Sequence, residues 1–317
     1  MLFSDEEKVY ILPAHPQTTH TGYYDNSLPP VLTITSGDTV VFETMMLFDN
    51  QFMPGLTYEE QAAVRAPYRE RKVGPHVLTG PVYIDGAEPG NVLEIQIGKM
   101  IPRSYGINLN HPDRGTLPED FPKGHKKDFY LDWTKRQTVF KPGIIIPLRP
   151  FHGSMAVAPK ETGKVSSSPP GSYGGNLDCK ELVEGTTLYL PVQVKGALFS
   201  VGDSHAAQGD GEVSVTAIET AFSEARLKFI VRKDMMKLER PMFETPSHWG
   251  TFGFHNDLDE AVKIALRDMI EFLVTTKKLS RFEAYSLCSI QGDLRCTQVV
   301  IKPKAIHMMM PKAIFKC

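Results

Sequence analysis

Apolar and polar residues alternate at several places in residues 1–250, and a tight turn precedes three of these runs. The turns are Gly37-Asp38-Thr39, Gly90-Asn91 and Gly185-Thr186, and each leads into apolar side chains at every second position. A period of two is the pattern of a strand with one buried face. We expect this region to be mainly β, with a sandwich or barrel-like core. The shared turn pattern allows two similar β units, although common turn chemistry also explains it.

A helical pattern replaces this alternation toward the C-terminal end. Apolar residues recur at helical spacing from Leu258 to Leu273 and predict an amphipathic helix. Ser280 with Glu283 three residues later has the form of a capping box, which predicts the start of a second helix. We therefore expect residues 251–317 to be a helical part that packs on the β region. The predicted fold is mainly β, of the α+β class, with C-terminal helices.

Residues 103–135 differ from the segments around them, because they carry many charges and prolines and show little periodicity. Such a stretch inside a β region is typical of a long excursion or a small insertion. No chemistry is assigned to it from the sequence.

The composition bounds the size and the environment of the protein. With 317 residues, 41% of them hydrophobic, the chain can bury a large core without disulfides. Its 35 lysines and arginines against 37 aspartates and glutamates leave no basic surplus for nucleic acid or an anionic membrane. The start lacks a signal-peptide pattern and no apolar run reaches bilayer length, so we expect a cytoplasmic protein. The four scattered cysteines are expected to be free thiols.

The densest group of acid, base and ligand side chains lies at residues 202–212, between two apolar runs. In an extended segment residues two apart share a face, so Asp203 and His205 can converge, and Asp210 and Glu212 can do so on a returning strand. Carboxylates packed beside apolar strands need a cation or a shared proton. A divalent metal would meet that need. A solvated hairpin tip with its acids facing water is an equally open alternative.

Other polar positions are less specific. The glycines of residues 174–178 allow close approach of a small ligand or ion, although such a loop is more often only a loop. Residues 151–159 are apolar apart from His152 and Ser154 and could present backbone amides to an anion. His20 and His76 border predicted strands, where a histidine is more often structural than a ligand.

The amino-acid sequences of these segments, taken in their order along the chain, resemble the acetamidase/formamidase family from about residue 18 to residue 302. Two departures are visible: Asn91 stands where that family commonly has an aspartate, and Cys296 replaces an apolar β-branched residue. Neither touches residues 202–212. The motifs that carry the resemblance are His20 with 28–32, 36–40, 78–83, 86–90, 151–159, 174–178, 201–212, 283–285 and 292–295.

The resemblance implies a β structure with an appended helical part, and hydrolysis of formamide, acetamide and similar short amides to the carboxylate and ammonia. Metal dependence is also implied. We assign Asp178, Asp203 and His205 to a divalent metal, with zinc the first candidate, because imidazole and carboxylate ligands suit that ion. Glu212 is the predicted general base, and Asp210 is the residue with which its role could be exchanged.

Further residues complete the predicted site. His20 and Glu43 are outer catalytic candidates, and Gly153, Ser154 and Asn176 are expected to contact the substrate. The apolar β segments and the methionines near the C-terminal end also predict a homo-oligomer. Besides a second copy of the chain, a small amide substrate is the expected partner.

Two other interpretations stay open. The serine-rich segment 167–172, with Lys164 nearby, superficially resembles a segment of amidase-signature enzymes, which would replace activated water with a serine nucleophile. A β module that binds a metal or a small ligand without catalysis is the alternative from another class, because one scaffold hosts many functions.

Overall fold

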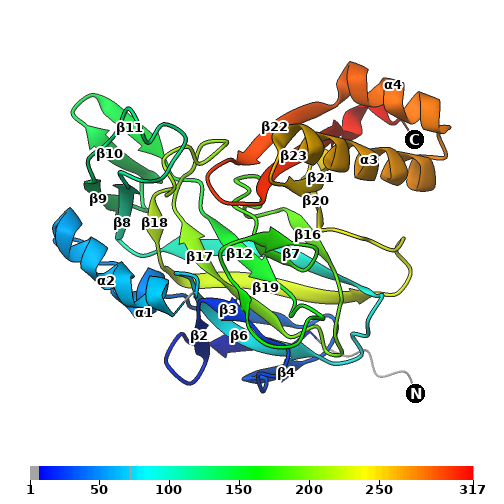
Figure 1. Cartoon of the computed structure of the whole chain (residues 1–317). Coiled ribbons are helices and arrows are strands. Elements are labelled where there is room, and N and C mark those ends of the chain that lie inside the picture. Colours follow the sequence, from blue (N-terminus) through cyan, green and yellow to red (C-terminus); the bar gives the residue numbers. More distant parts are fainter. Residues whose placement is uncertain (1–6, 72, 317) are drawn as a thin grey trace.

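The computed structural model describes residues 7–71 and 73–316 and confirms a mainly β fold with C-terminal helices (Figure 1). Two large sheets carry most of the strands, and a short pair, β3 (Tyr23–Tyr24) with β13 (Val165–Ser166), lies apart from them. The sandwich-like core expected from the alternating pattern lies between the two large sheets.

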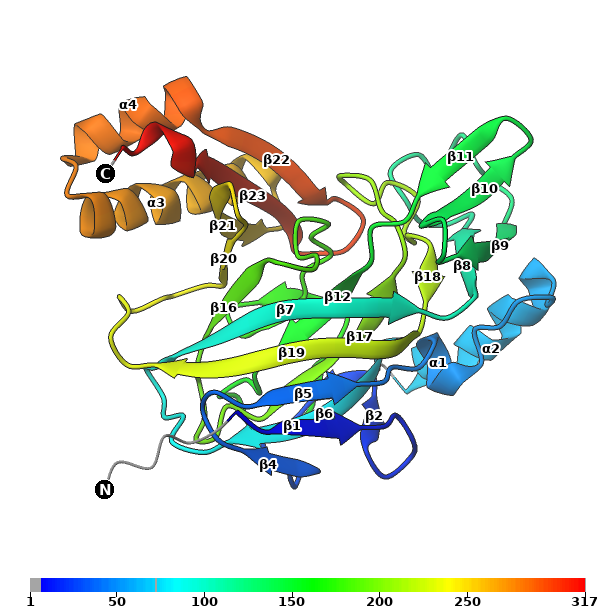
Figure 2. The ribbon, with the colours of Figure 1, turned by 180° about the vertical axis from the view of Figure 1, so that it is seen from behind.

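The first large sheet is nine-stranded, and its central strands β7 and β19 are each 11 residues long (Figure 2). They pair antiparallel along almost their whole length, from Phe222 opposite Pro102 to Arg232 opposite Val92. The predicted alternating runs form β5, β7 and β16. In spatial order the strands are β1 (Val9–Leu12), β5 (Thr39–Phe42), β19 (Phe222–Arg232), β7 (Val92–Pro102), β16 (Thr187–Pro191), β20 (Met242–Glu244), β21 (His248–His255), β23 (Lys304–Pro311) and β22 (Asp293–Gln298).

The second large sheet is twelve-stranded and branched. Its main path is β11 (Ile144–Pro147), β10 (Gln137–Lys141), β9 (His125–Asp132), β8 (Tyr105–Asn110), β18 (Glu219–Thr220), β17 (Phe199–His205), β12 (Phe151–Ala156), β15 (Gly174–Asn176) and β14 (Pro170–Gly171). The branch is β6 (Val77–Ile84), which pairs with β17 and with β2 (Thr19–Thr21) and β4 (Leu32–Ile34). Residues 103–135 thus contain β8 and β9, which extend this sheet.

Aromatic side chains from both sheets meet in the core. The ring centroids of Phe42 and Phe199 lie 6.1 Å apart, and those of Phe199 and Phe229 lie 5.0 Å apart. All three side chains are fully buried. Burial of each contributes roughly 1.5–3 kcal/mol relative to exposure. Phe199 lies on β17, so these contacts hold β17 against the first sheet.

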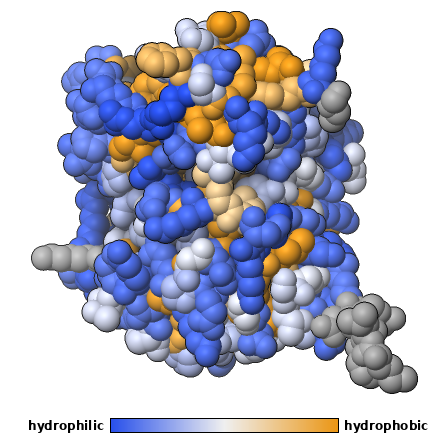
Figure 3. All heavy atoms as spheres, turned by 90° about the vertical axis from the view of Figure 1, so that its right-hand side faces the viewer, coloured by the Kyte–Doolittle hydropathy of each residue, from blue (hydrophilic) through white to orange (hydrophobic). Residues whose placement is uncertain are grey.

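The C-terminal region contains the two expected helices, α3 (Leu258–Lys277) and α4 (Arg281–Gln291), and the Ser280–Glu283 capping box is present. Met269 and Leu273 of α3 belong to the same buried cluster as Met308 and Met310 of β23. The expected helical part, residues 251–317, also contains strands, because β22, β23 and most of β21 lie there and extend the nine-stranded sheet. Figure 3 views the molecule from this side and shows apolar side chains at the upper end of that face.

Two further helices, α1 (Leu47–Asn50) and α2 (Tyr58–Glu70), stand against one end of the twelve-stranded sheet (Figure 1). Thr57 begins α2 with a capping box to Glu60. Cys179, Cys288 and Cys296 are free thiols, as expected, and Cys317 lies outside the described residues. No helix in the described part of the chain is long and apolar enough to cross a membrane.

Candidate active site

A pocket of about 180 Å³ lies between the α1–α2 segment and the twelve-stranded sheet. Leu47, Phe48 and Phe52 of the α1 segment form an apolar wall, and Ile301 contributes from the C-terminal region. The opposite wall is polar. A space of this size suits a small molecule with a few waters, each of which occupies about 30 Å³ in the liquid. The polar lining residues include His76, Asn176, Asp178, Asp203, His205, Glu212, Thr216 and Glu219.

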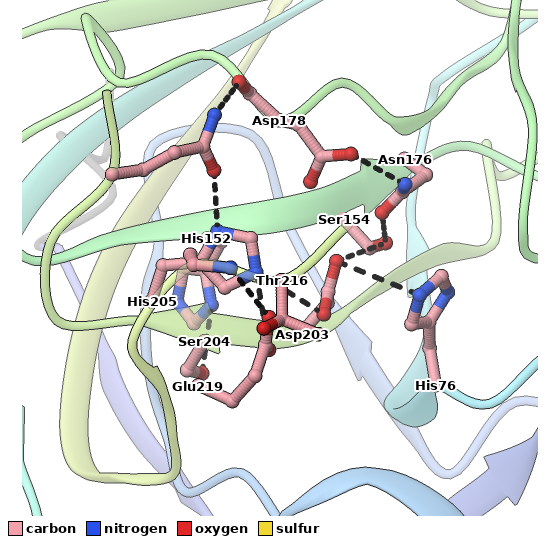
Figure 4. Close-up of polar contacts among 12 residues, drawn as sticks. His76, His152, Ser154, Asn176, Asp178, Asp203, Ser204, His205, Thr216 and Glu219 are labelled. Atoms are coloured by element: carbon pink, nitrogen blue, oxygen red, sulfur yellow. Dashed lines mark hydrogen bonds and ion pairs between the residues drawn. The ribbon is translucent and has the colours of Figure 1, made fainter. Parts of the chain in front are cut away.

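Buried carboxylates from four segments converge on His205 in this pocket. Figure 4 shows Asp178, Asp203 and Glu219 near His205. Asp203 lies with His205 on β17, Asp178 follows β15, and Glu219 lies on β18. Glu212 comes from the loop between β17 and β18. Two overlapping groups share His205, one with Asp178 and Asp203 and the other with Glu212 and Glu219, and in each group the ligand atoms lie within 4.8 Å of one another. We call these five residues the site cluster.

Three of these carboxylate residues have a left-handed backbone conformation, with φ of 47° at Asp178, 53° at Asp203 and 45° at Glu212. Residues other than glycine rarely occupy that region, and those that do concentrate at functional sites. The turn at Asp203 also breaks the pleat of β17. In a regular strand, residues two apart share one face. Here Phe199 and Val201 pack in the core, whereas the next odd-numbered residues, Asp203 and His205, line the pocket.

Gly153 of β12 makes room for the site cluster. A Cβ atom at this position would lie 2.4 Å from Oδ2 of Asp203 and 2.7 Å from Oδ1 of Asp178. Both distances are shorter than any normal contact, so only glycine allows the strand to approach the two carboxylates this closely. The predicted substrate-binding position Gly153 is therefore part of the wall behind the carboxylates.

Ser154 and Asn176, the other predicted substrate-binding residues, hold the carboxylates in place. Asn176 donates from Nδ2 to Oδ2 of Asp178 at 2.6 Å. Ser154 donates from Oγ to Oδ1 of Asn176 at 3.0 Å and lies 3.4 Å from Oδ2 of Asp203. Asn176 also lines the pocket, whereas Ser154 is buried behind it.

The orientation of the His205 ring is fixed by Gln208. The Gln208 Nε2 atom donates to the backbone carbonyl of Asp178 at 2.7 Å, so its Oε1 atom is the acceptor that lies 2.9 Å from Nδ1 of His205. Nδ1 must then carry a proton, and Nε2 is the nitrogen that faces the cluster. It lies 3.4 Å from Oδ1 of Asp203 and 3.3 Å from Oε2 of Glu219. Without a proton, Nε2 would direct its lone pair at two carboxylates, so a proton or a metal ion must lie between Nε2 and the carboxylate oxygens.

The charges of the site cluster are unbalanced. Burial and the neighbouring Asp203 raise the pKa of Asp178 well above its usual value, and burial and Asp178 do the same to the pKa of Glu212. Burial opposes the charge of His205, but Glu219 and Asp203 raise its pKa well above the usual range. Burial also opposes the charge of Asp203, but His76 and His205 lower its pKa to about 2.

The cluster also leaves a ligand atom unused. Oδ1 of Asp178 is fully buried and has no hydrogen-bond partner in the described part of the chain. An excess of buried carboxylate with a free oxygen and an oriented imidazole fits a divalent cation, and perturbed carboxyl groups of this kind are typical of acid–base sites.

Asp210 lies outside the site cluster, contrary to the predicted hairpin. Residues 213–217 are irregular rather than a returning strand, and β18 begins only at Glu219. The Asp210 carboxylate is bound by Nε and Nη2 of Arg295, at 2.8 and 2.6 Å, and by Nζ of Lys180 at 3.2 Å. Arg295 also contacts Glu181 at 3.1 Å. With Arg149, which pairs with Glu181, these residues form a network that we call the brace.

The site loop is also joined to the C-terminal region through its backbone. The Gly211 amide donates to the carbonyl of Thr297 at 3.1 Å, and the Val299 amide donates to the carbonyl of Gly211 at 3.1 Å. Gly211 and Gln298 thereby form an isolated parallel bridge. The position of Glu212 consequently depends on residues almost 90 positions later in the chain.

His20 and Glu43, the outer catalytic candidates, do not line the pocket. Nδ1 of His20 lies 3.3 Å from the carbonyl oxygen of Gly80, and burial lowers its pKa to about 4. The Glu43 carbonyl accepts from Oγ1 of Thr79 at 2.8 Å. These contacts join neighbouring strands to one another.

Two pocket residues received no role from the sequence. Glu219 is a charged residue in an otherwise small or apolar run, and this contrast was the signal that could have found it. His76 precedes the apolar strand β6, and its Nε2 atom lies 3.7 Å from Oδ2 of Asp203. Its Nδ1 atom lies 3.1 Å from the carbonyl of Ser167, which orients the ring toward the cluster.

The chain is similar in sequence and in overall structure to known proteins. The acetamidase/formamidase family model matches residues 12–167 and 160–317. An acetamidase structure from Bacillus halodurans is similar with a TM-score of 0.86 and 33% identity, over 96% of this chain and 98% of that one. An acetamidase structure from Yersinia enterocolitica has a TM-score of 0.89 and 27% identity, over 99% and 95% of the two chains. A formamidase of Methylophilus methylotrophus is 29% identical over 250 residues, which are 59% of this chain and 61% of that protein. The matched stretches span less than two thirds of the curated relatives' length.

Proposed function

The chain belongs to the acetamidase/formamidase family, and from this premise we propose that it hydrolyses short aliphatic amides to the carboxylate and ammonia. Formamide and acetamide are the first candidate substrates, since related proteins bear the names formamidase and acetamidase. The observation that carries the proposal is the buried site cluster around His205 on the wall of a small pocket.

We propose that Asp178, Asp203 and His205 hold a divalent metal, with zinc the first candidate. The free Oδ1 of Asp178 and the inward-facing Nε2 of His205 support this assignment. When bound, such an ion acidifies water and polarises the amide carbonyl. Glu219, within 3.3 Å of His205, completes the second ligand group and could share the ion.

Glu212 is the proposed proton carrier. Its raised pKa and its place on the pocket wall suit a carboxyl group that accepts a proton from the attacking water and delivers it to the departing nitrogen. Such proton transfer contributes about 10²–10⁴-fold to the rate. Asn176 and the Gly153 wall fix the carboxylates, and the apolar wall on the α1 side limits access of bulk water.

The test is ammonia release from formamide and acetamide, measured with and without added zinc, together with the metal content by elemental analysis. Two variants separate the roles. His205→Ala should lose the metal and the activity together, whereas Glu212→Gln should keep the metal and lose mainly kcat. Absence of ammonia release from every one- to three-carbon amide with metal restored would refute the proposal and favour a binding module. Loss of metal in Glu212→Gln alone would overturn the division of roles.

A serine nucleophile is not favoured by the geometry. Ser168 lines the pocket, but no base contacts its hydroxyl among residues 7–71 and 73–316. The Ser167 hydroxyl is buried without a partner there, and Lys164 lies over the ring of Tyr23, 4.3 Å from its centroid.

We also propose that the protein acts in the cytoplasm as a homo-oligomer, without nucleic-acid or membrane partners. Exposed apolar side chains on α4, such as Phe282 and Ile290, and on the β10–β11 hairpin, such as Val139 and Ile145, support self-association. Light scattering at micromolar concentration should give a mass above that of a monomer. A monomer mass would contradict it.

A further inference from the structure

Two arginines that line the pocket make no ion pair with an acid among residues 7–71 and 73–316. Arg65 comes from α2 and Arg114 from the turn that follows β8, and both belong to the lining of the pocket that contains the site cluster. Both side chains are half-buried. No hydrogen bond or ion pair of either guanidinium group occurs in the described part of the chain, whereas Arg69, one turn later on α2, pairs with Asp113 at 3.2 Å.

Every other half-buried arginine of the described chain forms an ion pair with an acid. Arg232 contacts Glu94 and Asp234, Arg240 contacts Asp268, and Arg295 contacts Asp210 and Glu181. A guanidinium group that loses water normally gains a carboxylate or phosphate partner, because its desolvation is otherwise uncompensated. Arg65 and Arg114 lack this compensation within the described chain.

Both cations and acids act on the two guanidinium groups. Burial and the charge of Arg114 lower the pKa of Arg65 to about 10, and burial and the charge of Arg69 lower the pKa of Arg114; Asp113 opposes both shifts, and Glu212 opposes that of Arg114. His111, on the same wall, has a pKa lowered to about 4 by burial and by Arg65, so it is neutral and adds no third charge. Two cations therefore line a pocket whose other wall carries the carboxylates.

We propose that Arg65 and Arg114 form an anion subsite that binds a carboxylate on the substrate, so the preferred substrates are short amides that bear a carboxylate at the far end of the chain. This inference rests on the proposed amide hydrolysis and names its substrate class. The amide group lies at the site cluster, and the carboxylate accepts the forked donors of the two guanidinium groups. A pocket of about 180 Å³ restricts such a substrate to a few carbons.

The experiment compares two four-carbon amides of similar shape, succinamate with its carboxylate and butyramide with a methyl group in its place. Ammonia release should give a kcat/KM for succinamate at least roughly tenfold above that for butyramide, as charge-assisted hydrogen bonds of this kind allow. In Arg65→Gln/Arg114→Gln this ratio should fall to about one. Arg71→Gln, which changes an exposed arginine at the end of α2 outside the pocket lining, is the matched control and should keep the wild-type ratio.

The outcomes separate the subsite from the reaction. Equal kcat/KM for the two amides in the wild type, or an unchanged ratio in the double variant, overturns the subsite while leaving amide hydrolysis intact. If no amide is hydrolysed, succinate serves as the probe: a rise in melting temperature that succinate produces in the wild type and not in the folded double variant supports the subsite. The absence of any such rise overturns it.

Discussion

Two groups of buried or half-buried carboxylates lie side by side in this chain and are treated in opposite ways. Asp210 is separated from Glu212 by one residue, and Asp178 from Glu181 by two. In the brace, Asp210 contacts Arg295 and Lys180, and Glu181 contacts two arginines. In the site cluster no lysine or arginine of the described residues forms an ion pair with an acid, and the ion-pair partners are histidines.

The difference teaches how to distinguish structural charge from functional charge. The acids of the brace meet cations of full charge, which lowers their free energy in the folded state without any bound ion. The site cluster has left-handed backbone at three of its acids and an unpartnered oxygen on Asp178. Neither feature stabilises the fold. An arrangement that is unfavourable for the empty protein and favourable around a cation is what a metal site requires.

The largest expected effect comes from Asp178→Asn, which removes one acid from the unbalanced group. Activity should fall about 10³-fold or more together with metal content, since one change removes both a ligand and a charge. The melting temperature of the metal-free protein should rise, because repulsion with Asp203 and Glu212 is relieved. Amide hydrolysis, elemental analysis and thermal unfolding in chelator check these three outcomes. A variant that is less stable without metal contradicts the view that the cluster is unfavourable when empty.

The second-largest effect concerns the stability of the brace region at acid pH. His307 on β23 is fully buried, its Nδ1 atom lies 2.8 Å from Oγ1 of Thr297, and burial lowers its pKa to about 4. The charges that act on it from the brace, Asp210 and Glu181 against Arg295 and Lys180, are two of each sign and oppose one another. Burial therefore decides its protonation.

Because the folded pKa of His307 lies below the unfolded value, the unfolded chain binds the proton first as pH falls. Stability is then fully present above about pH 6.5 and is lost toward about pH 4, by up to about 3 kcal/mol from this residue. His307→Gln should reduce the difference in denaturant midpoint between pH 7 and pH 4.5, whatever its effect at pH 7. An unchanged difference would show that other groups control the acid transition.

A smaller effect is expected for Asp210→Asn, which breaks the brace. Stability should fall by about 1–2 kcal/mol, less than for a deeply buried pair, because Asp210 and Arg295 are each about 30% exposed. Metal content should be retained and kcat/KM should fall less than about tenfold. Denaturant unfolding and steady-state kinetics measure both. A loss of turnover as large as that of Glu212→Gln would restore Asp210 as a catalytic residue and remove the contrast between the two groups.

The smallest effect is expected outside both groups. Ser280→Ala removes the Oγ atom that accepts from the Glu283 amide at the start of α4, and should lower stability by about 1 kcal/mol without changing kcat/KM. Thermal unfolding and ammonia release check this. Any change in metal content would mean that the helical region acts on the site more strongly than its contacts indicate.

Local patterns of sequence predicted the local features of this structure. The capping box at Ser280, the α3 stripe and the alternating strands each depend on residues a few positions apart, and all are present. Asp203 and His205 do line one pocket, but the reason is different from a regular pleat, because the left-handed turn at Asp203 redirects the strand.

Contacts between distant segments could not be predicted in the same way. Glu219 reaches His205 because β18 pairs with β17 in a register that places the two residues opposite each other. Asp210 leaves the site because Arg295, 85 residues later, binds it. The spacing of residues within 202–212 contains neither fact. The predicted convergence of Asp210 with Glu212 was therefore wrong, although Glu212 itself lines the pocket.

The bridge between Gly211 and Gln298 sets an order of events during synthesis of the protein. Asp203 on β17 and Asp178 after β15 leave the ribosome long before residues 297–299, which hold the Glu212 loop, and before Ile301, which completes the pocket wall. A nascent chain released early would therefore lack the arrangement that we assign to catalysis. Translation must pass these residues before the pocket can take its finished form.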